Sequence, residues 1–277
     1  MLKKRVFLKG LRALFEPMYG KLTHQAFFER LHQYSLKGLS AGSGAYTEDS
    51  SERLTIQQIK DFYKDAPKLV CFDVGANVGQ FTTLLHQVMG DQAIIHSFEP
   101  SAATFQNLQK NTAAFSGVTV HHLGLGESPG KLQLFTNNDA SLIASLYPRR
   151  LDHFGIQMDK NEEVDILTLD GFCAQNNISH IHFLKMDVEG HELSVLKGGK
   201  ALLQNAKIDF IQFEFGGCNI DSRTYFQDFW YLLSNDYTIY RIVKDGLYEI
   251  RAYHETLENF ITTNFLARRK QLNASVN

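Results

Sequence analysis

The sequence has 277 residues, of which 44% are hydrophobic and 21% are charged, a composition typical of a soluble globular protein that buries a large core. Its 28 basic and 30 acidic side chains leave a net charge of -2, so no nucleic-acid partner is expected, since such a partner requires a basic surface. Three widely spaced cysteines disfavour a disulfide framework or a structural zinc site, and no apolar run approaches the ~20 residues that cross a bilayer, so we expect a cytoplasmic location.

Residues 1–66 are expected to form a helical N-terminal extension. In "MLKKRVFLKGLRALF" basic and apolar residues alternate in a way typical of an amphipathic helix. Such a helix can make a weak contact with an anionic membrane surface, or it can pack on the main domain or on another subunit of a homo-oligomer. A signal peptide fits poorly, because the segment lacks a long apolar run and a small-residue cleavage site.

From residue 67 to residue 277, short apolar runs alternate with helical patterns. This alternation predicts an α/β domain with right-handed crossovers and a doubly wound, mostly parallel sheet. Strands are expected at 68–74, 93–98, 117–125, 180–188 and 207–215, with an apolar run at 164–173 after a loop-rich middle. Helices are expected at about 78–89, 101–115, 192–203 and 225–234, and Ser101 is placed to cap the second of them. The last runs, at 237–243, 246–250 and 264–269, follow too closely for crossover helices and predict an antiparallel C-terminal edge.

A ligand of such a sheet binds at the carboxyl ends of the strands, where the strand order reverses. "CFDVGANVGQF" places Asp73 at the end of the first expected strand and two glycines, Gly75 and Gly79, in the turn before the next helix. Glycines let the backbone approach a ligand closely, and the start of a helix offers unpaired N–H groups. Glu99 ends the second strand and can accept hydrogen bonds from both ribose hydroxyls, while Pro100 helps to fix the direction of its carboxylate.

The dinucleotide pattern G-x-G-x-x-G is not matched, because Asn77 and Gln80 stand where its second and third glycines would be. An acid at Asp73 would also repel a pyrophosphate. It suits a ligand with an ammonium and a sulfonium group, which favours S-adenosylmethionine over NAD as the cofactor.

Several segments, in this order, resemble the motif series of FkbM-type S-adenosylmethionine-dependent methyltransferases. They are "FDVGANVGQF", "SFEPSAATFQNLQKN", "HLGLGESPGKLQLF", "LTLDGF", "FLKMDVEGHELSVLKGG" and "FIQFEF". The resemblance covers about residues 68–218, and "KMDVEGHE" is its most specific part. It implies a Rossmann-like methyltransferase sheet of seven strands and, in most cases, O-methylation of a hydroxyl in a sugar, glycan or secondary metabolite.

The resemblance also implies roles for individual residues. The methionine part of the cofactor would be surrounded by Asp73, Gly75, Asn77 and Gly79, with Glu99 and Pro100 at the ribose. Gly124 and Leu125 match the stretch that meets the adenine. Many methyltransferases have an Asp near that point, and this chain offers glycines and Glu127 instead.

The chemistry requires a group that accepts the proton of a hydroxyl acceptor. Candidates lie in "LKMDVEGHE" and "QFEF", namely Asp187, Glu189, His191 and Glu214, all placed just past neighbouring strands. In an extended segment Lys185, Asp187 and Glu189 would share one face, and Asp187 could instead hold the ammonium group of the cofactor. The same side chains would suit a hard divalent cation if they converged, but spacing alone does not establish this and we expect no metal ion. Glu192 is expected to stabilise the start of a helix.

Two further questions stay open at this point. In the loop-rich middle, Arg149, Arg150 and His153 could meet an anionic acceptor or could form a solvated loop. The function could also be that of an NAD-linked oxidoreductase, which needs a pyrophosphate loop, or of a non-catalytic module that keeps a cofactor pocket for regulation or assembly.

Overall fold

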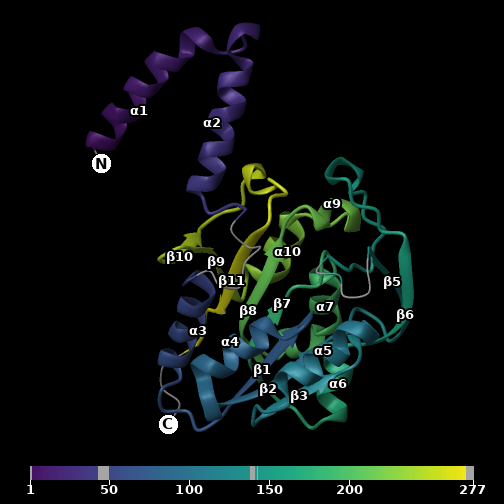
Figure 1. Cartoon of the computed structure of the whole chain (residues 1–277). Coiled ribbons are helices and arrows are strands. Elements are labelled where there is room, and N and C mark those ends of the chain that lie inside the picture. Colours follow the sequence, from purple (N-terminus) through teal and green to yellow (C-terminus); the bar gives the residue numbers. More distant parts are fainter. Residues whose placement is uncertain (1, 43–49, 138–140, 142, 273–277) are drawn as a thin grey trace. The chain divides into compact units, whose positions relative to one another are not determined.

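The structure, a computed structural model, describes residues 2–42, 50–137, 141 and 143–272 (Figure 1). The chain divides into two compact units, Met1–Ala41 and Gly42–Asn277. The first unit contains the helices α1 (Leu2–Phe15) and α2 (Gln25–Gly38), joined through the short 3-10 turns η1 (Glu16–Met18) and η2 (Leu22–His24). Among the described residues, no helix is both long enough and apolar enough to span a membrane.

The described part of the predicted extension, residues 2–42 and 50–66, contains three α-helices, and the last of them does not belong with the other two. Helix α3 (Ser50–Phe62) lies within the second unit, since Ile56 and Ile59 are buried against strands of the sheet and against helix α4 (Gln80–Met89). The compact units thus separate after Ala41 rather than near residue 66.

An eight-stranded sheet forms the centre of the second unit, with the strand order β10-β9-β11-β8-β7-β1-β2-β3 (Figure 1). The five strands from β8 to β3 are parallel, and β11, β9 and β10 add an antiparallel edge. Their bounds are β1 (Leu69–Val74), β2 (Ala93–Phe98), β3 (Val118–His121), β7 (Ile181–Met186), β8 (Ile208–Phe215), β9 (Tyr237–Val243), β10 (Gly246–Ile250) and β11 (Thr263–Arg269). The predicted mostly parallel sheet with an antiparallel C-terminal edge is confirmed, with eight strands where the resemblance implied seven.

A second, three-stranded sheet has the order β4-β6-β5 and stands beside the first. Its strands are β4 (Gly124–Leu125), β5 (Gly130–Thr136) and β6 (Lys160–Leu167). The single strand expected at 117–125 is wrong, because the chain leaves the main sheet after His121 and Gly124 pairs with Ile166 of β6. Strand β5 was hidden in the segment expected to be loop-rich, and its first four residues are exposed, as befits an edge outside the main core.

Helices cover both faces of the main sheet (Figure 1). Helices α3 and α4 bury their apolar side chains on one face. The other face is covered by α6 (Leu169–Gln175), α7 (Glu192–Gly198), α8 (Lys200–Gln204) and α10 (Phe226–Leu233). Helix α5 (Ala102–Thr112) leads from β2 to β3, and the short α9 (Cys218–Ser222) follows β8.

Two local expectations about these helices need correction. The helix expected at 192–203 is broken at Gly199, where an added Cβ would come within 2.7 Å of the Leu169 side chain, so α6 packs closely on this break. Ser101 does occupy the N-cap position of α5, but its side chain makes no capping hydrogen bond. Instead the Ser101 N–H donates to the Glu99 carboxylate at 2.9 Å and the Ala102 N–H to that of Glu162 at 3.3 Å.

A row of buried polar side chains crosses the middle of the main sheet. Ser97, Asp73, Lys185 and Gln212 are lateral neighbours on β2, β1, β7 and β8, and all four are buried. Thr82 of α4 lies over the row, with its Oγ1 2.7 Å from Asp73 Oδ2 and 2.8 Å from Ser97 Oγ. At the other end, Gln212 donates to the Glu52 carboxylate of α3 at 3.3 Å. We call the four lateral neighbours Ser97, Asp73, Lys185 and Gln212 the polar row.

Candidate functional site

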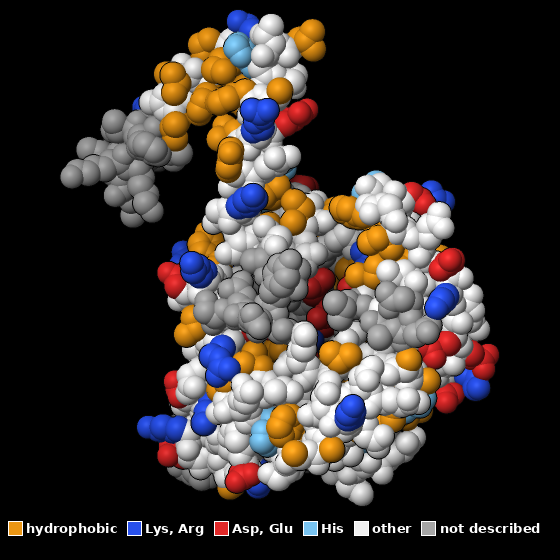
Figure 2. All heavy atoms as spheres, in the orientation of Figure 1, with side chains coloured by type: hydrophobic (Ala, Val, Ile, Leu, Met, Phe, Trp, Pro, Cys, Tyr) orange, Lys and Arg blue, Asp and Glu red, His pale blue; other side chains and the backbone are white. Residues whose placement is uncertain are grey.

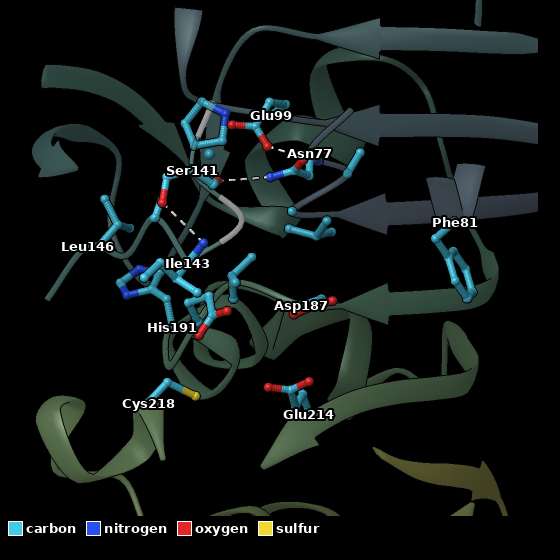
Figure 3. A pocket seen from close by; sticks show the side chains of 18 of the residues that line it. Asn77, Phe81, Glu99, Ser141, Ile143, Leu146, Asp187, His191, Glu214 and Cys218 are labelled. Atoms are coloured by element: carbon cyan, nitrogen blue, oxygen red, sulfur yellow. Dashed lines mark hydrogen bonds between the residues drawn. The ribbon is translucent and has the colours of Figure 1, made fainter. Parts of the chain in front are cut away.

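A cavity of about 720 Å³ opens at the carboxyl ends of the parallel strands (Figure 3). Its walls come from the segments that follow β1, β2, β7 and β8, from the small sheet and from residues 260–262 before β11. The strand order reverses between β1 and β7, because β1 continues to β2 on one side while the later strands β7 and β8 lie on the other. The cavity thus lies where ligands of doubly wound sheets bind, and its volume is typical of small-molecule sites.

The turn after β1 forms one wall of this cavity. Gly75 has a φ of 80°, and a Cβ added there would lie 1.9 Å from the backbone oxygen of Asp187, so only glycine fits. Asn77 also has a positive φ, and its side-chain oxygen accepts the Val78 N–H at 2.8 Å, which stabilises the turn. Gly79 does not line the cavity: its added Cβ would meet Leu108 and Thr112 of α5, so this glycine serves helix packing.

Asp73 is also absent from the cavity lining, contrary to the position that the sequence suggested for it. Its side chain is fully buried in the polar row, where Oδ2 accepts the Thr82 hydroxyl and Oδ1 lies 3.5 Å from Lys185 Nζ. Residue 73 still lies within β1 and its side chain faces Thr82 of α4, whereas the cavity lining begins with Val74 and the turn that follows it. Asp73 is therefore linked to the cavity through its ion pair with Lys185, which is a lining residue.

The end of β2 supplies a carboxylate to the opposite wall. Glu99 lines the cavity and accepts the N–H groups of Asn77 and Ser101, each at 2.9 Å, which fixes the carboxylate in place (Figure 3). Burial raises the pKa of Glu99 to about 7 although these two hydrogen bonds act to lower it. Pro100, Gly124 and Leu125 continue the same wall, and a Cβ on Gly124 would lie 2.8 Å from Ile166 and 3.6 Å from Pro100.

Asp187 lies at the centre of the cavity, just past β7 (Figure 3). Its carboxylate is 3.3 Å from Lys185 Nζ and 41% exposed, so it remains open to a ligand. Lys185 also stands 4.8 Å from the centre of the Phe81 ring. Burial acts to lower the pKa of Lys185, but the charges of Asp187 and Asp73 outweigh it and raise the pKa.

Glu52 of α3 is a lining residue that the sequence did not reveal. Burial raises its pKa to about 7, and its Oε2 has no hydrogen-bond partner among the described residues. No sequence signal near residue 52 points to the site, since its partner Gln212 lies 160 residues away.

Glu189 also faces the cavity, but it does not share an extended face with Asp187. Its φ of 49° is left-handed, because the strand has ended and Gly190 turns the chain into α7. The carboxylate accepts Arg149 Nη1 at 2.6 Å, and Arg149 Nε lies 3.8 Å from Asp221. Burial and the charge of Asp187 raise the pKa of Glu189 to about 8. The Arg149 side chain is thus held by two acids and is not a solvated loop side chain.

Glu214 points into the cavity from the end of β8 (Figure 3). It is 8% exposed, and no hydrogen bond or ion pair reaches its carboxylate from the described residues. Burial, together with the charges of Asp187 and Glu189, raises the pKa of Glu214 well above its ordinary value. A carboxylate oxygen of Glu189, a carboxylate oxygen of Glu214 and the sulfur of Cys218 lie within 4.8 Å of one another. The structure thus brings the two acids together with a thiol and leaves His191 outside this group.

His191 lines the cavity on the side of the small sheet. Its Nδ1 is 3.0 Å from the Tyr147 hydroxyl, and burial lowers its pKa to about 4, so the ring is neutral. Glu192 is fully buried and accepts the N–H groups of Val188 at 2.9 Å and Gly190 at 3.3 Å. It stabilises the start of α7, in agreement with the prediction.

A further wall that the sequence did not reveal comes from residue 141 and residues 143–146. Ser141 accepts a hydrogen bond from Asn77 Nδ2 through its backbone oxygen at 3.1 Å, while Ile143 and Leu146 add apolar surface (Figure 3). The Ser145 hydroxyl donates to the backbone oxygen of Glu189 at 2.7 Å. These contacts tie the segment to the turns after both β1 and β7.

The cavity as a whole is acidic. Its lining contains five carboxyl groups, from Glu52, Glu99, Asp187, Glu189 and Glu214, against the two basic groups of Lys185 and Arg149. Burial raises the pKa of four of these acids, Glu52, Glu99, Glu189 and Glu214. A positively charged ligand would stabilise their ionised forms, whereas a phosphate-rich ligand would be repelled.

Comparison with known proteins identifies the family. The family described as "Methyltransferase FkbM domain" matches residues 73–239. The chain belongs to this family. The FkbM domain match runs from the end of β1 past β8 and includes all cavity carboxylates except Glu52, so α3 adds a lining residue from outside the matched region.

Three relatives show similar levels of likeness. The chain is 30% identical over 141 residues to "Methyltransferase 1" of Beauveria bassiana, a match that covers 46% of this chain and 56% of that protein. It is 29% identical over 148 residues to "Hexuronic acid methyltransferase AglP" of Haloferax volcanii, covering 53% and 56%. It is 27% identical over 156 residues to "31-O-demethyl-FK506 methyltransferase FkbM" of Streptomyces tacrolimicus, covering 48% and 60%. The chain therefore spans little more than half the length of these relatives.

A second cluster lies away from the cavity, at the amino ends of the strands. Asp209 accepts hydrogen bonds from His180 Nε2 at 2.6 Å, from Arg269 at 2.8 Å and from the Tyr63 hydroxyl, while His182 Nδ1 accepts the Val70 N–H at 2.9 Å. The carboxylate has protein donors on both oxygens, so the cluster connects Tyr63, one residue past α3, with β8 and β11. Both histidines therefore hold neighbouring segments of the FkbM domain together.

Proposed function

We propose that this chain transfers a methyl group from S-adenosylmethionine to a hydroxyl group of a sugar, a glycan or a secondary metabolite. The observation that carries the proposal is the acidic cavity at the strand-order reversal, in which five carboxyl groups face two basic groups. S-adenosylmethionine has a sulfonium and an ammonium group, so it matches this charge. NAD does not, because its pyrophosphate would meet the same acids.

Several lining residues fit this cofactor. The turn at Gly75 leaves no space for a side chain, because it packs directly on the backbone of Asp187 across the cavity wall. The fixed Glu99 carboxylate would accept ribose hydroxyls, and Gly124 with Leu125 would border the adenine. Asp187, exposed and centrally placed, would hold the ammonium group. Asp73 and Gly79 support the site from beneath without touching the ligand space.

The sulfonium of the cofactor supplies an activated methyl group, so the protein's task is to align the acceptor and to exclude water. The apolar side chains of Ile143, Leu146 and Phe260 would shield the reacting atoms from solvent. An acceptor hydroxyl must also lose its proton. Glu214 would accept that proton, since it is buried, faces the cavity and has no partner among the described residues. Glu189 is less available, because Arg149 already holds its carboxylate.

The acceptor class rests on the relatives as well as on the cavity. One similar protein is named for a hexuronic acid and another for 31-O-demethyl-FK506, which supports an oxygen atom as the methyl acceptor. The second half of the cavity, around Glu189 and Glu214, is rich in hydrogen-bond acceptors suited to the hydroxyl groups of a polyol.

Calorimetry tests the cofactor. We expect S-adenosylmethionine to bind the full chain and NAD to show no binding. The Glu99→Gln variant should bind S-adenosylmethionine about ten- to a hundred-fold more weakly, since one charged acceptor for the ribose is lost. Glu249→Gln, a change of an exposed acid on β10, is the matched control. Tight NAD binding, or unchanged affinity in Glu99→Gln, would contradict the assignment.

A methyl-transfer assay against sugars, glycans and hydroxylated metabolites tests the chemistry. In Glu214→Gln we expect turnover to fall by about 10² to 10⁴ with the affinity for S-adenosylmethionine nearly unchanged, because the proton acceptor is lost and the cofactor half of the cavity is kept. A rate profile that still falls at low pH with the same midpoint in the variant would assign the proton transfer to another group. Binding of the cofactor without turnover on any acceptor in the panel would favour the non-catalytic alternative.

A further inference from the structure

The first compact unit differs in charge from the rest of the chain. Residues 1–41 contain eight Lys and Arg but only two acidic residues, Glu16 and Glu29, although the whole chain has more acids than bases. Lys9, Arg12, Lys21, Arg30 and Lys37 are exposed. Residues 1–41 thus carry a net charge of +6 (8 − 2), whereas residues 42–277 carry −8 (20 − 28).

The same unit exposes many apolar side chains (Figure 2). Leu22 is 88% exposed, Tyr34 71% and Leu14 64%, and they are joined by Tyr19, Phe27, Leu31 and Leu39. From residue 9 to residue 41 only Leu36 and Ala41 are buried. Ring contacts of Phe28 with Phe15 and Tyr19 connect the two halves of the unit, at centroid distances of 6.1 and 5.8 Å. Two helices of 14 residues each with so small a core need an external surface to be stable.

Charged and apolar side chains occupy separate faces of α2. Phe27, Leu31 and Tyr34 follow the spacing i, i+4, i+7 and therefore form one stripe along the helix. Arg30 and Lys37 lie directly beside this stripe at helical spacing, and Glu29 lies on the far side. An apolar stripe bordered by cations is typical of a helix that lies in the plane of a membrane surface.

We propose that residues 1–41 form a docking unit for the surface of an anionic lipid bilayer. The apolar stripe would enter the boundary between headgroups and acyl chains, and the flanking basic groups would pair with anionic headgroups. A second copy of this unit is a poorer partner, because each copy carries the same excess of positive charge. A nucleic acid would match the charge but would leave the apolar stripe uncovered. This role is independent of the proposed methyl transfer.

Vesicle co-sedimentation of the full chain tests the proposal. We expect binding to vesicles of phosphatidylcholine mixed with phosphatidylglycerol, weaker binding at high salt, and little binding to phosphatidylcholine alone. The double variant Arg30→Gln, Lys37→Gln should partition about 25-fold more weakly, at roughly five-fold per charge. Leu22→Ser, outside the two long helices, should weaken partitioning about ten-fold.

Matched controls come from the second unit. Lys200→Gln with Lys207→Gln removes two exposed cations, and Tyr248→Ser removes an exposed ring. Both controls should bind vesicles as the parent chain does. Equal binding of the parent chain to neutral and anionic vesicles, or unchanged binding of both test variants, would overturn the proposal. So would a dimer in light scattering that Leu22→Ser converts to a monomer, because a second copy would then cover the apolar surface.

Discussion

Replacing Glu52 with Gln should stabilise the protein at neutral and basic pH. Burial, the largest cause, raises the pKa of Glu52 from 4.5 to about 7, in spite of Lys185 and the hydrogen bond from Gln212. This difference corresponds to about 3 kcal/mol of unfavourable free energy once the carboxyl is ionised in the folded state. A Gln at this position does not titrate. Its amide can also donate to Gln212 Oε1, which has no hydrogen-bond partner among the described residues.

The pH dependence of this stabilisation follows from the raised pKa of Glu52 in the folded state. A carboxyl with a raised pKa in the folded state favours folding most below its unfolded value near 4.5, and this contribution is lost as the pH rises to about 7. The free energy of unfolding of Glu52→Gln should therefore exceed that of the parent chain by less than about 1 kcal/mol at pH 5 and by about 3 kcal/mol at pH 8.

Urea unfolding measures this difference, with the fluorescence of the sole tryptophan, Trp230, as a probe of the second unit. Glu249→Gln, which removes an exposed acid, should follow the parent chain at each pH. A constant difference between Glu52→Gln and the parent chain from pH 5 to pH 8 would refute the reasoning, since the burial of an ionisable group would then not be the cause.

Three other predictions follow from the site and its supports. Binding of S-adenosylmethionine near pH 7.5 should release protons, because burial raises the pKa of Glu189 to about 8 and that of Glu99 to about 7, and a bound cation would lower both. Calorimetry in two buffers of different ionisation enthalpy measures the number of protons released. Identical binding enthalpies in the two buffers would contradict the prediction. Gly75→Ala should abolish cofactor binding, since its Cβ would meet the Asp187 backbone oxygen at 1.9 Å; Gly246→Ala, with open space around it, should bind normally, and equal binding by both variants would argue against the close approach. Asp209→Asn should cost about 3–5 kcal/mol of unfolding free energy at pH 7, because Arg269 loses its charged partner. Burial acts to raise the pKa of Asp209, but the hydrogen bonds from His180 and Tyr63 outweigh it and lower the pKa, so the loss should shrink as the pH falls below about 4, and a loss that persists unchanged there would point to packing instead.

Much of the fold could be predicted because its signals are local. Apolar runs and glycine turns fixed β1, β2, β7 and β8, and the short spacing of the last runs predicted the antiparallel edge. The site positions at Gly75, Glu99 and Glu214 followed from their place at the ends of those strands. Each of these inferences needs only a few neighbouring residues.

The remainder depends on contacts between distant segments. Asp73 stands at the end of β1, but its direction is set by its lateral neighbours Ser97 and Lys185, which no local pattern reveals. Glu52 reaches the cavity only through the packing of α3. The left-handed backbone at Glu189 ends the extended face that alternation alone would continue.

The polar row has a consequence for how the strands find their alignment. Lys185 lies beside Asp73 only in the native pairing of β1 with β7, and Gln212 lies beside Lys185 only in that of β7 with β8. A slip of one residue would turn an ammonium or a carboxylate toward the phenylalanine-rich side of the sheet, at a large cost in desolvation. The polar row therefore favours one register of the strands among the several that the surrounding valine, leucine and isoleucine residues would tolerate.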